Sequence, residues 1–175
     1  MHYTLRRSTR ARSLRLAVHP DGAIVITAPE RYELSLIEKF FVTHAAWAQR
    51  KVDAAKKRTV IRVPRSTVAQ LKKDALALAH EGASRYARLY GRTYRTITIR
   101  AQKSRWGSCS KSGNLSFNYK IAALPTALRE YIIVHEICHL AHMDHSRAFW
   151  DLVAESVPQH KKRRAELRNI VFTHA

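Results

Sequence analysis

The most constraining feature of this sequence is the segment His135-Glu136-Ile137-Cys138-His139, in which two histidines stand four residues apart. The preceding residues 126–134 repeat apolar side chains at helical spacing, and helix positions i and i+4 share one face. Two imidazoles one turn apart can share a Zn²⁺ ion. The segment therefore predicts a helix with a metal site, and places Glu136 where it can accept a proton from water.

A catalytic zinc site takes three protein ligands and leaves one position open. Two more histidines follow, and the first of them, His142, would lie about 10.5 Å along a straight helix from the first ligand. His145 reaches the ion if the helix ends near 141–143 and the chain turns back, with Asp144 or Ser146 capping the next helix. We favour His145 as the third ligand, and His142 stays open as a helix-end or substrate-facing residue.

Cysteine content and hydropathy limit the classes of protein to which the chain can belong. Hydrophobic residues make up 46% of the chain, which is enough for a packed core. The sequence has no run of 18 apolar residues, so we expect no membrane-spanning helix. Only Cys109 and Cys138 occur, which is too few for a disulfide framework and suits the cytoplasm. Cys138 points a quarter-turn away from the histidine face, so we interpret it as a core residue.

The formal charge of +19 favours polyanionic partners such as nucleic acid, nucleotides or acidic surfaces. A solvated basic surface explains the same charge equally well, because the basic residues are spread along the whole chain. No phosphate-binding glycine loop and no DNA-reading motif is present. The charge alone therefore does not choose among these partners.

Hydrophobic periodicity predicts an N-terminal lobe, residues 1–60, and a core, residues 61–175. The lobe consists of a β-hairpin over 13–28 and a helix from a capping box at Ser35–Glu38 to about Lys57. In the core we expect helices over 67–90, from Thr126 onward, 146–157 and 159–171, and strands over 93–101 and 113–124.

Several motifs together resemble the YgjP-like metal-dependent hydrolases, which are grouped with zincin metallopeptidases and are similar to the WLM and SprT-like families. The motifs are the Trp-Gly-Ser-Cys segment Arg105–Ser110, Gly113–Ser116, Val134–Leu140 and His145–Trp150. The resemblance implies an α+β, zincin-like core with a small β-sheet and the histidine-bearing helix. It also implies zinc ligands at His135, His139 and His145 and a catalytic Glu136.

The resemblance extends to the substrate side of the site. In zincins an edge strand beside the metal pairs with extended substrate, so residues 103–118, Trp106 among them, are candidates for substrate contact. Gly107 would permit an irregular backbone or a bulge there. Phe149 and Trp150 would anchor the third ligand. His142 stands where metzincins have glycine, which argues against a true metzincin.

The sequence therefore predicts a zinc-dependent metallopeptidase that acts on a peptide or protein, with Glu136 as general base. Arg105, His142 and Tyr119 are candidates to stabilise the oxyanion. One alternative is a metal-dependent nucleotide pyrophosphatase, and another is a SprT-like protease or basic protein in contact with nucleic acid. Three histidines and a water also suit Ni, Co, Fe or Mn.

Overall fold

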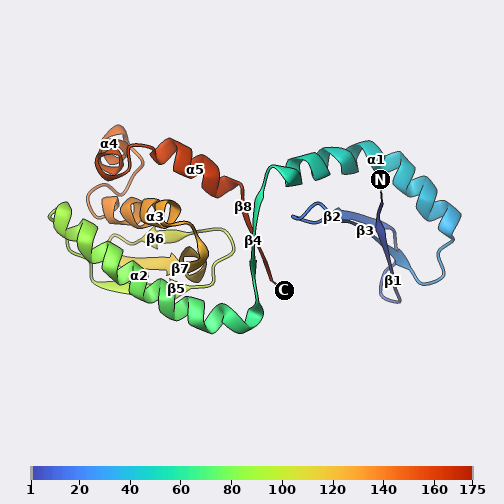
Figure 1. The fold of residues 1–175 in the computed structure, drawn as a ribbon, viewed down its shortest axis with the longest axis horizontal. Helices are drawn as coiled ribbons and strands as arrows, with labels where there is room; N and C mark the ends of the chain where they lie inside the picture. Colours follow the sequence, from blue (N-terminus) through green and yellow to red (C-terminus); the bar gives the residue numbers. More distant parts are fainter. Residues whose placement is uncertain (1, 175) are drawn as a thin grey trace. The chain divides into compact units, whose positions relative to one another are not determined.

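A computed structural model describes residues 2–174, which fold into two compact units. The first unit runs up to Arg62 and includes Asn169–Thr173, and the second is Val63–Arg168. Each unit contains a three-stranded sheet and at least one long helix (Figure 1). The predicted α+β class, with a small sheet and a helix that carries the histidine motif, is confirmed. No helix among residues 2–174 is long and apolar enough to cross a membrane.

In the first unit a sheet of three strands packs against one helix. The strands β1 (Thr4–Ser8), β2 (Arg15–Val18) and β3 (Ile24–Pro29) stand in the order β1-β3-β2, with β1 parallel and β2 antiparallel to β3. The predicted hairpin is confirmed, and its turn uses Gly22 at φ 87°. The helix α1 (Leu34–Lys56) buries Ile37 against Ile26 and Ala28.

Two further strands of the chain pair with each other. β4 (Thr59–Val63) and β8 (Ile170–His174) form a two-stranded sheet, and the amide of Thr59 donates to the carbonyl of Asn169 at 2.9 Å. Sequence periodicity predicted neither strand. The helix expected over 159–171 is therefore too long, because it ends at Arg168 and the chain then extends into β8.

The second unit repeats the strand arrangement of the first. Its strands β5 (Thr96–Arg100), β6 (Gly107–Cys109) and β7 (Asn114–Asn118) stand in the order β5-β7-β6, with β5 parallel and β6 antiparallel to β7. The sheet therefore has two edge strands, β5 and β6, and β6 is the one that packs against α3. The remaining elements are η1 (Arg65–Thr67), α2 (Val68–Leu89), η2 (Tyr119–Ala123), α3 (Thr126–Cys138), α4 (Arg147–Ser156) and α5 (His160–Arg168).

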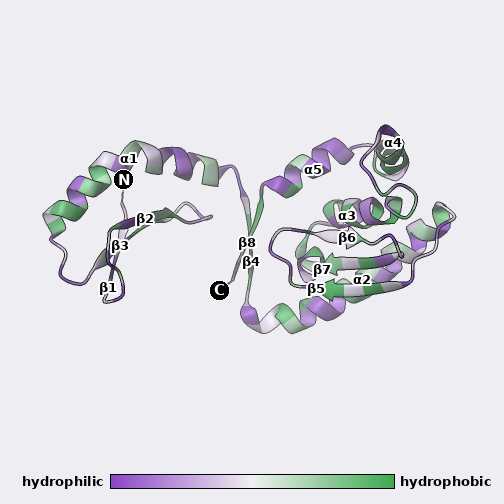
Figure 2. Ribbon diagram, turned by 180° about the vertical axis from the view of Figure 1, so that it is seen from behind, coloured by the Kyte–Doolittle hydropathy of each residue, from purple (hydrophilic) through white to green (hydrophobic). Residues whose placement is uncertain are grey.

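Small side chains let α2 approach α3 and η2 closely. The helix buries Ala75, Ala79, Gly82 and Ala83, and a Cβ at Gly82 would lie only 2.8 Å from Ile133 of α3. Because interiors are close-packed, this small-residue face fixes the position of α3. In Figure 1, α3 lies between β6 on one side and α4 and α5 on the other. Figure 2 shows that α5 is mostly hydrophilic.

Three sequence predictions about element ends are wrong. Ser35 does not cap α1, because the helix begins at Leu34 with Glu33 before it and no side-chain cap. The strand expected over 113–124 ends at Asn118, whose side chain accepts from the amide of Lys120 and starts the 3₁₀ turn η2. The motif helix ends at Cys138 rather than near 141–143. At Asn118 a local side-chain hydrogen bond sets the end of the strand, and periodicity does not report such a bond.

Candidate metal centre

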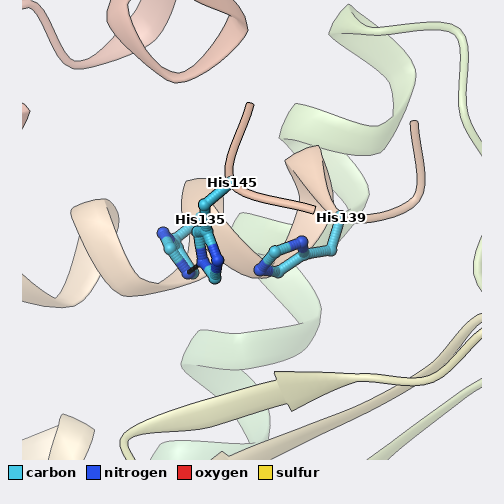
Figure 3. Close-up of side chains that lie close together, drawn as sticks. All are labelled: His135, His139 and His145. Atoms are coloured by element: carbon cyan, nitrogen blue, oxygen red, sulfur yellow. Dashed lines mark hydrogen bonds between the residues drawn. The ribbon is translucent and has the colours of Figure 1, made fainter. Parts of the chain in front are cut away.

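Three imidazoles converge at the end of α3. His135 lies on the last turn of the helix, His139 follows it at the helix end, and His145 comes from the segment before α4 (Figure 3). One ring nitrogen of each residue lies within 4.8 Å of the others, and the Nε2 atoms of His135 and His145 are 3.2 Å apart. The structure thus brings together the three residues that the sequence predicted as ligands. Whether they bind a metal stays a prediction.

The early end of α3 is what lets His145 return. The chain leaves the helix after Cys138, and the side chain of Ser146 then accepts from the amide of Phe149 at 3.5 Å, which starts α4. The expectation that Ser146 caps this helix is confirmed. The carbonyl of His142 accepts a hydrogen bond from Nδ1 of His139 at 2.9 Å. Since a carbonyl only accepts, Nδ1 carries the proton and Nε2 keeps its lone pair.

Burial favours the neutral forms of His135 and His139. The pKa of His135 falls to about 3, mainly through burial and in addition through the neighbouring His139, His145 and Arg164. Burial also lowers the pKa of His139, and the hydrogen bond that its Nδ1 donates to the His142 carbonyl opposes this shift. Neutral imidazoles carry the lone pair that a metal requires.

Aromatic side chains of α4 hold the three rings in place. Phe149 is fully buried, stacks on His139 with ring centroids 4.5 Å apart, and meets the edges of His135 and His145 at 4.9 Å each. Trp150 stacks on His145 at 5.6 Å and on His160 at 5.4 Å. The expectation that both residues anchor the third histidine agrees with these contacts.

Glu136 lies beside the histidines, buried against the edge strand of the sheet. Its side chain is 6% exposed, and burial raises its pKa to about 8, a rise that the charge of Arg105 opposes. A Cβ at Gly107 would lie 2.6 Å from Oε1 and 2.7 Å from Cγ of Glu136. Gly107 pairs regularly with Phe117 and has no positive φ, so the strand has no bulge where the glycine would permit one. The glycine provides space for the carboxylate instead.

A cavity of about 530 Å³ opens onto this site. Its wall includes Arg105, Trp106, His135, Glu136 and His145. In the described part of the chain, neither Tyr119 nor the His142 imidazole lines it. Tyr119 is buried in η2, and His142 contributes its backbone carbonyl. Of the substrate-side candidates, the structure therefore places Arg105 and Trp106 at the cavity and the other two away from it.

Residues 62–170, more than half of the chain, match the model of the YgjP-like metallopeptidase domain. The chain belongs to the YgjP-like family. The predictions of this family and of a metal-dependent hydrolase are confirmed. Two solved structures are also similar, and both are metallopeptidase zymogens: abylysin of Pyrococcus abyssi and jannalysin of Methanocaldococcus jannaschii.

The similarity to these two proteins is distant. Abylysin is 23% identical, with a TM-score of 0.47 over 53% of this chain and 99% of its own. Jannalysin is 21% identical, with a TM-score of 0.44 over 51% of this chain and 91% of its own. No curated protein matches the chain. The family assignment therefore depends on the matching domain model.

The residues of this YgjP-like chain fit a divalent metal. Nε2 of His135 and Nε2 of His145 face each other at 3.2 Å, and Nδ1 of His139 donates to the His142 carbonyl, which leaves the lone pair on its Nε2. A cation among the three rings would accept one lone pair from each imidazole, and three histidine nitrogens are a donor set that zinc accepts.

Sequence reasoning did not place Tyr131, Arg164 and Arg168 in the cavity wall, and it named Trp150 only as an anchor of His145. The first three had a local signal. Tyr131 stands one helical turn before His135 and shares its face, while Arg164 and Arg168 stand one turn apart on α5. Only tertiary packing of α5 against α3 brings the two arginines to the histidines, so the sequence alone does not identify them.

Proposed function

We propose that this YgjP-like protein is a zinc-dependent peptide hydrolase. The observation that carries the proposal is the set of three imidazoles whose nitrogens lie within 4.8 Å of one another beside a buried carboxyl group, in a chain of a metallopeptidase family. His135, His139 and His145 would hold the ion. When bound, it would supply Lewis acidity that polarises a carbonyl and lowers the pKa of water.

Glu136 is the proposed general base. Its position next to the histidines lets it take a proton from the attacking water and pass it to the leaving amine. A pKa raised by burial toward neutrality suits both halves of that transfer. Gly107 keeps the carboxylate in this position, because any larger residue would occupy its space.

The edge strand β6 is the proposed support for the peptide. It is one of the two edges of the sheet, so its outer backbone groups can pair with an extended chain. Arg105 precedes this strand and lines the cavity close enough for its charge to act on Glu136. We assign Arg105 the role of stabilising negative charge on the carbonyl oxygen during the reaction.

The test is peptide cleavage by wild-type protein beside Glu136→Gln and the control Glu130→Gln. A mixture of unrelated peptides is incubated with zinc-loaded protein, and products are read by mass spectrometry. We expect cleavage by the wild type and by Glu130→Gln, which alters an exposed residue of the same helix. Glu136→Gln should keep its metal and lose activity by about 100-fold or more. Full activity in that variant would contradict the proposal.

Nucleotide hydrolysis is the second candidate, and one observation favours it. Three arginines, Arg105, Arg164 and Arg168, line the cavity, and guanidinium groups bind phosphates well. Release of pyrophosphate or phosphate from nucleoside triphosphates by zinc-loaded protein would support this reaction. Cleavage of peptides without such release would remove it.

A further inference from the structure

The wall of the cavity carries more positive charge than the reaction requires. Arg105, Arg164 and Arg168 line it, and Glu136 is the one acidic residue in the wall. Among residues 2–174, none of these three arginines forms an ion pair with a carboxylate, whereas four other basic residues do. The cavity therefore offers unneutralised guanidinium groups to whatever enters it.

The helix α5 shows the contrast within one element. Arg163 is paired with Glu166 at 3.0 Å and also donates to Gln159. Arg164 and Arg168 stand four residues apart and line the cavity together. Like charges at this spacing destabilise a helix unless an anion lies between them. The pair thus has the geometry of an anion-binding site that faces the candidate metal centre.

The two arginines are close to the residues that would meet the substrate. Arg164 lies over the ring of Trp150 at 5.4 Å, which limits the freedom of its guanidinium. Burial raises the pKa of Tyr131, and the charges of Arg164 and Arg168 oppose that rise. The charge of Arg164 also acts on His135. The charge of Arg105, by contrast, lowers the pKa of Glu136. Arg164 and Arg168 are therefore available to bind a different group of the substrate.

We propose that Arg164 and Arg168 bind a carboxylate of the peptide substrate close to the bond that is cleaved. This carboxylate is either an acidic side chain or the free C-terminus, because both present the same planar pair of oxygens to a guanidinium. The inference rests on the proposed peptide hydrolysis. It assigns to this site a selection for acidic or C-terminal segments.

The first arm of the test measures cleavage of matched peptides. A peptide that the wild type cleaves is prepared in matched pairs. In one set of pairs, Glu or Asp at a position near the cut is compared with Gln or Asn at that position. In the other pair, a free C-terminus is compared with an amidated one. We expect kcat/KM to be higher for the carboxylate forms. In the double variant Arg164→Gln/Arg168→Gln that preference should fall by about 10- to 100-fold. Cleavage of the neutral, amidated peptide should fall much less than cleavage of the carboxylate forms.

The peptide for which the double variant loses its preference shows whether the bound carboxylate is an acidic side chain or the free C-terminus. Loss of preference for the free C-terminus alone would assign a C-terminal carboxylate, and loss for one acidic position would assign a side chain. The control is Arg163→Gln, which removes one positive charge from the same helix but not from the cavity wall. If this control reduces the preference as much as the double variant, the effect is general charge and the proposal is wrong.

The second arm measures binding without turnover. Calorimetry of metal-free protein is done with acetyl-Ala-Glu, acetyl-Ala-Gln-amide and inorganic pyrophosphate. We expect acetyl-Ala-Glu to bind more tightly than the amide, and the difference to vanish in the double variant with an unchanged Tm. Equal binding of the two peptides by the wild type would overturn the inference. So would tighter binding of pyrophosphate that depends on the same two arginines.

The two arms separate failure of the inference from failure of the proposed function. If the wild type cleaves no peptide yet binds acetyl-Ala-Glu through Arg164 and Arg168, the reaction is wrong and the carboxylate site stands. If the wild type cleaves peptides without preference, the reaction stands and the carboxylate site is wrong.

Discussion

The two units contain the same three-stranded arrangement, yet the candidate metal centre lies in the second. In both sheets the third strand is central, the first is parallel to it, and the second is the antiparallel edge. In the first unit the edge strand places Leu16 opposite Ile26, where it packs on the core. In the second unit Gly107 stands opposite Phe117, and Glu136 occupies the space that a side chain would fill.

This difference teaches that the strand order does not create the site. The same frame supports a filled core in one unit and a buried carboxyl group beside three histidines in the other. The residues that decide are one glycine on an edge strand and one helix that ends early. Predictions that alter either unit at corresponding points therefore test this interpretation directly.

The largest effect is expected from Phe149→Ala. Loss of a fully buried ring should lower the free energy of unfolding by about 3–5 kcal/mol. Because the ring touches all three histidines, zinc affinity should also fall by about 10- to 100-fold. The control Phe41→Ala alters an aromatic residue of the first unit and should cost stability alone. Zinc titration measures the affinity of both variants, and denaturant unfolding measures their stability. An unchanged zinc affinity in Phe149→Ala would contradict this prediction.

A smaller effect, on turnover, is expected from Gly107→Ala. The new methyl group would meet Oε1 and Cγ of Glu136, so the carboxylate must move, and activity should fall about 100-fold. Gly82→Ala creates an equally close contact with the end of Ile133, which can turn away. That control should lose some stability and keep its kcat. Steady-state kinetics of the two variants decides, and normal turnover in Gly107→Ala would contradict the assigned role.

Leu16→Ala makes the edge strand of the first unit resemble that of the second. Removal of a half-buried leucine that packs on Ile26, Ala28 and Ile37 should lower the free energy of unfolding by about 1–2 kcal/mol. Peptide cleavage should not change. Ala17→Ser on the exposed side of the same strand serves as the control in urea unfolding. A loss of activity in Leu16→Ala at unchanged stability would mean that the first unit takes part in the reaction.

The smallest effect is expected from Glu130→Gln. This residue pairs with Arg85 at 2.7 Å on the surface of the second unit, and exposed ion pairs contribute less than about 1 kcal/mol. Urea unfolding at low and high salt would measure it, and the small difference from wild type should shrink as salt rises. A loss above about 2 kcal/mol would mean that the pair is more than a surface contact.

The sequence predicts well what depends on neighbouring residues. The hairpin before β3, the long helix α2 and the helix that carries His135 and His139 follow from turn residues and periodicity. The choice of His145 over His142 as the residue that joins them was also right about proximity, because the helix ends at Cys138 and the chain then brings His145 back to the other two imidazoles. The cap of α4 was also predictable, because capping depends on neighbouring residues, and Ser146 is the cap of the two that the sequence offered.

What the sequence does not predict depends on distant segments. The pairing of β4 with β8 joins residues more than 100 positions apart, and neither strand alternates clearly. Tyr119 was a candidate to stabilise the oxyanion, but it lies in the 3₁₀ turn η2, where it is buried away from the cavity. Arg164 and Arg168 read as surface charge until the packing of α5 against α3 brings them to the cavity. Such placements follow from tertiary packing, which overrides local pattern.

The most direct test of the central claim is the metal content of three proteins: wild type, His145→Ala and His142→Ala. Each is purified without a tag, loaded with zinc, dialysed and assayed by elemental analysis. We predict about one zinc per chain in the wild type and in His142→Ala, whose backbone carbonyl still orients His139, and little in His145→Ala. Full zinc in His145→Ala, or its loss from His142→Ala alone, would contradict the account.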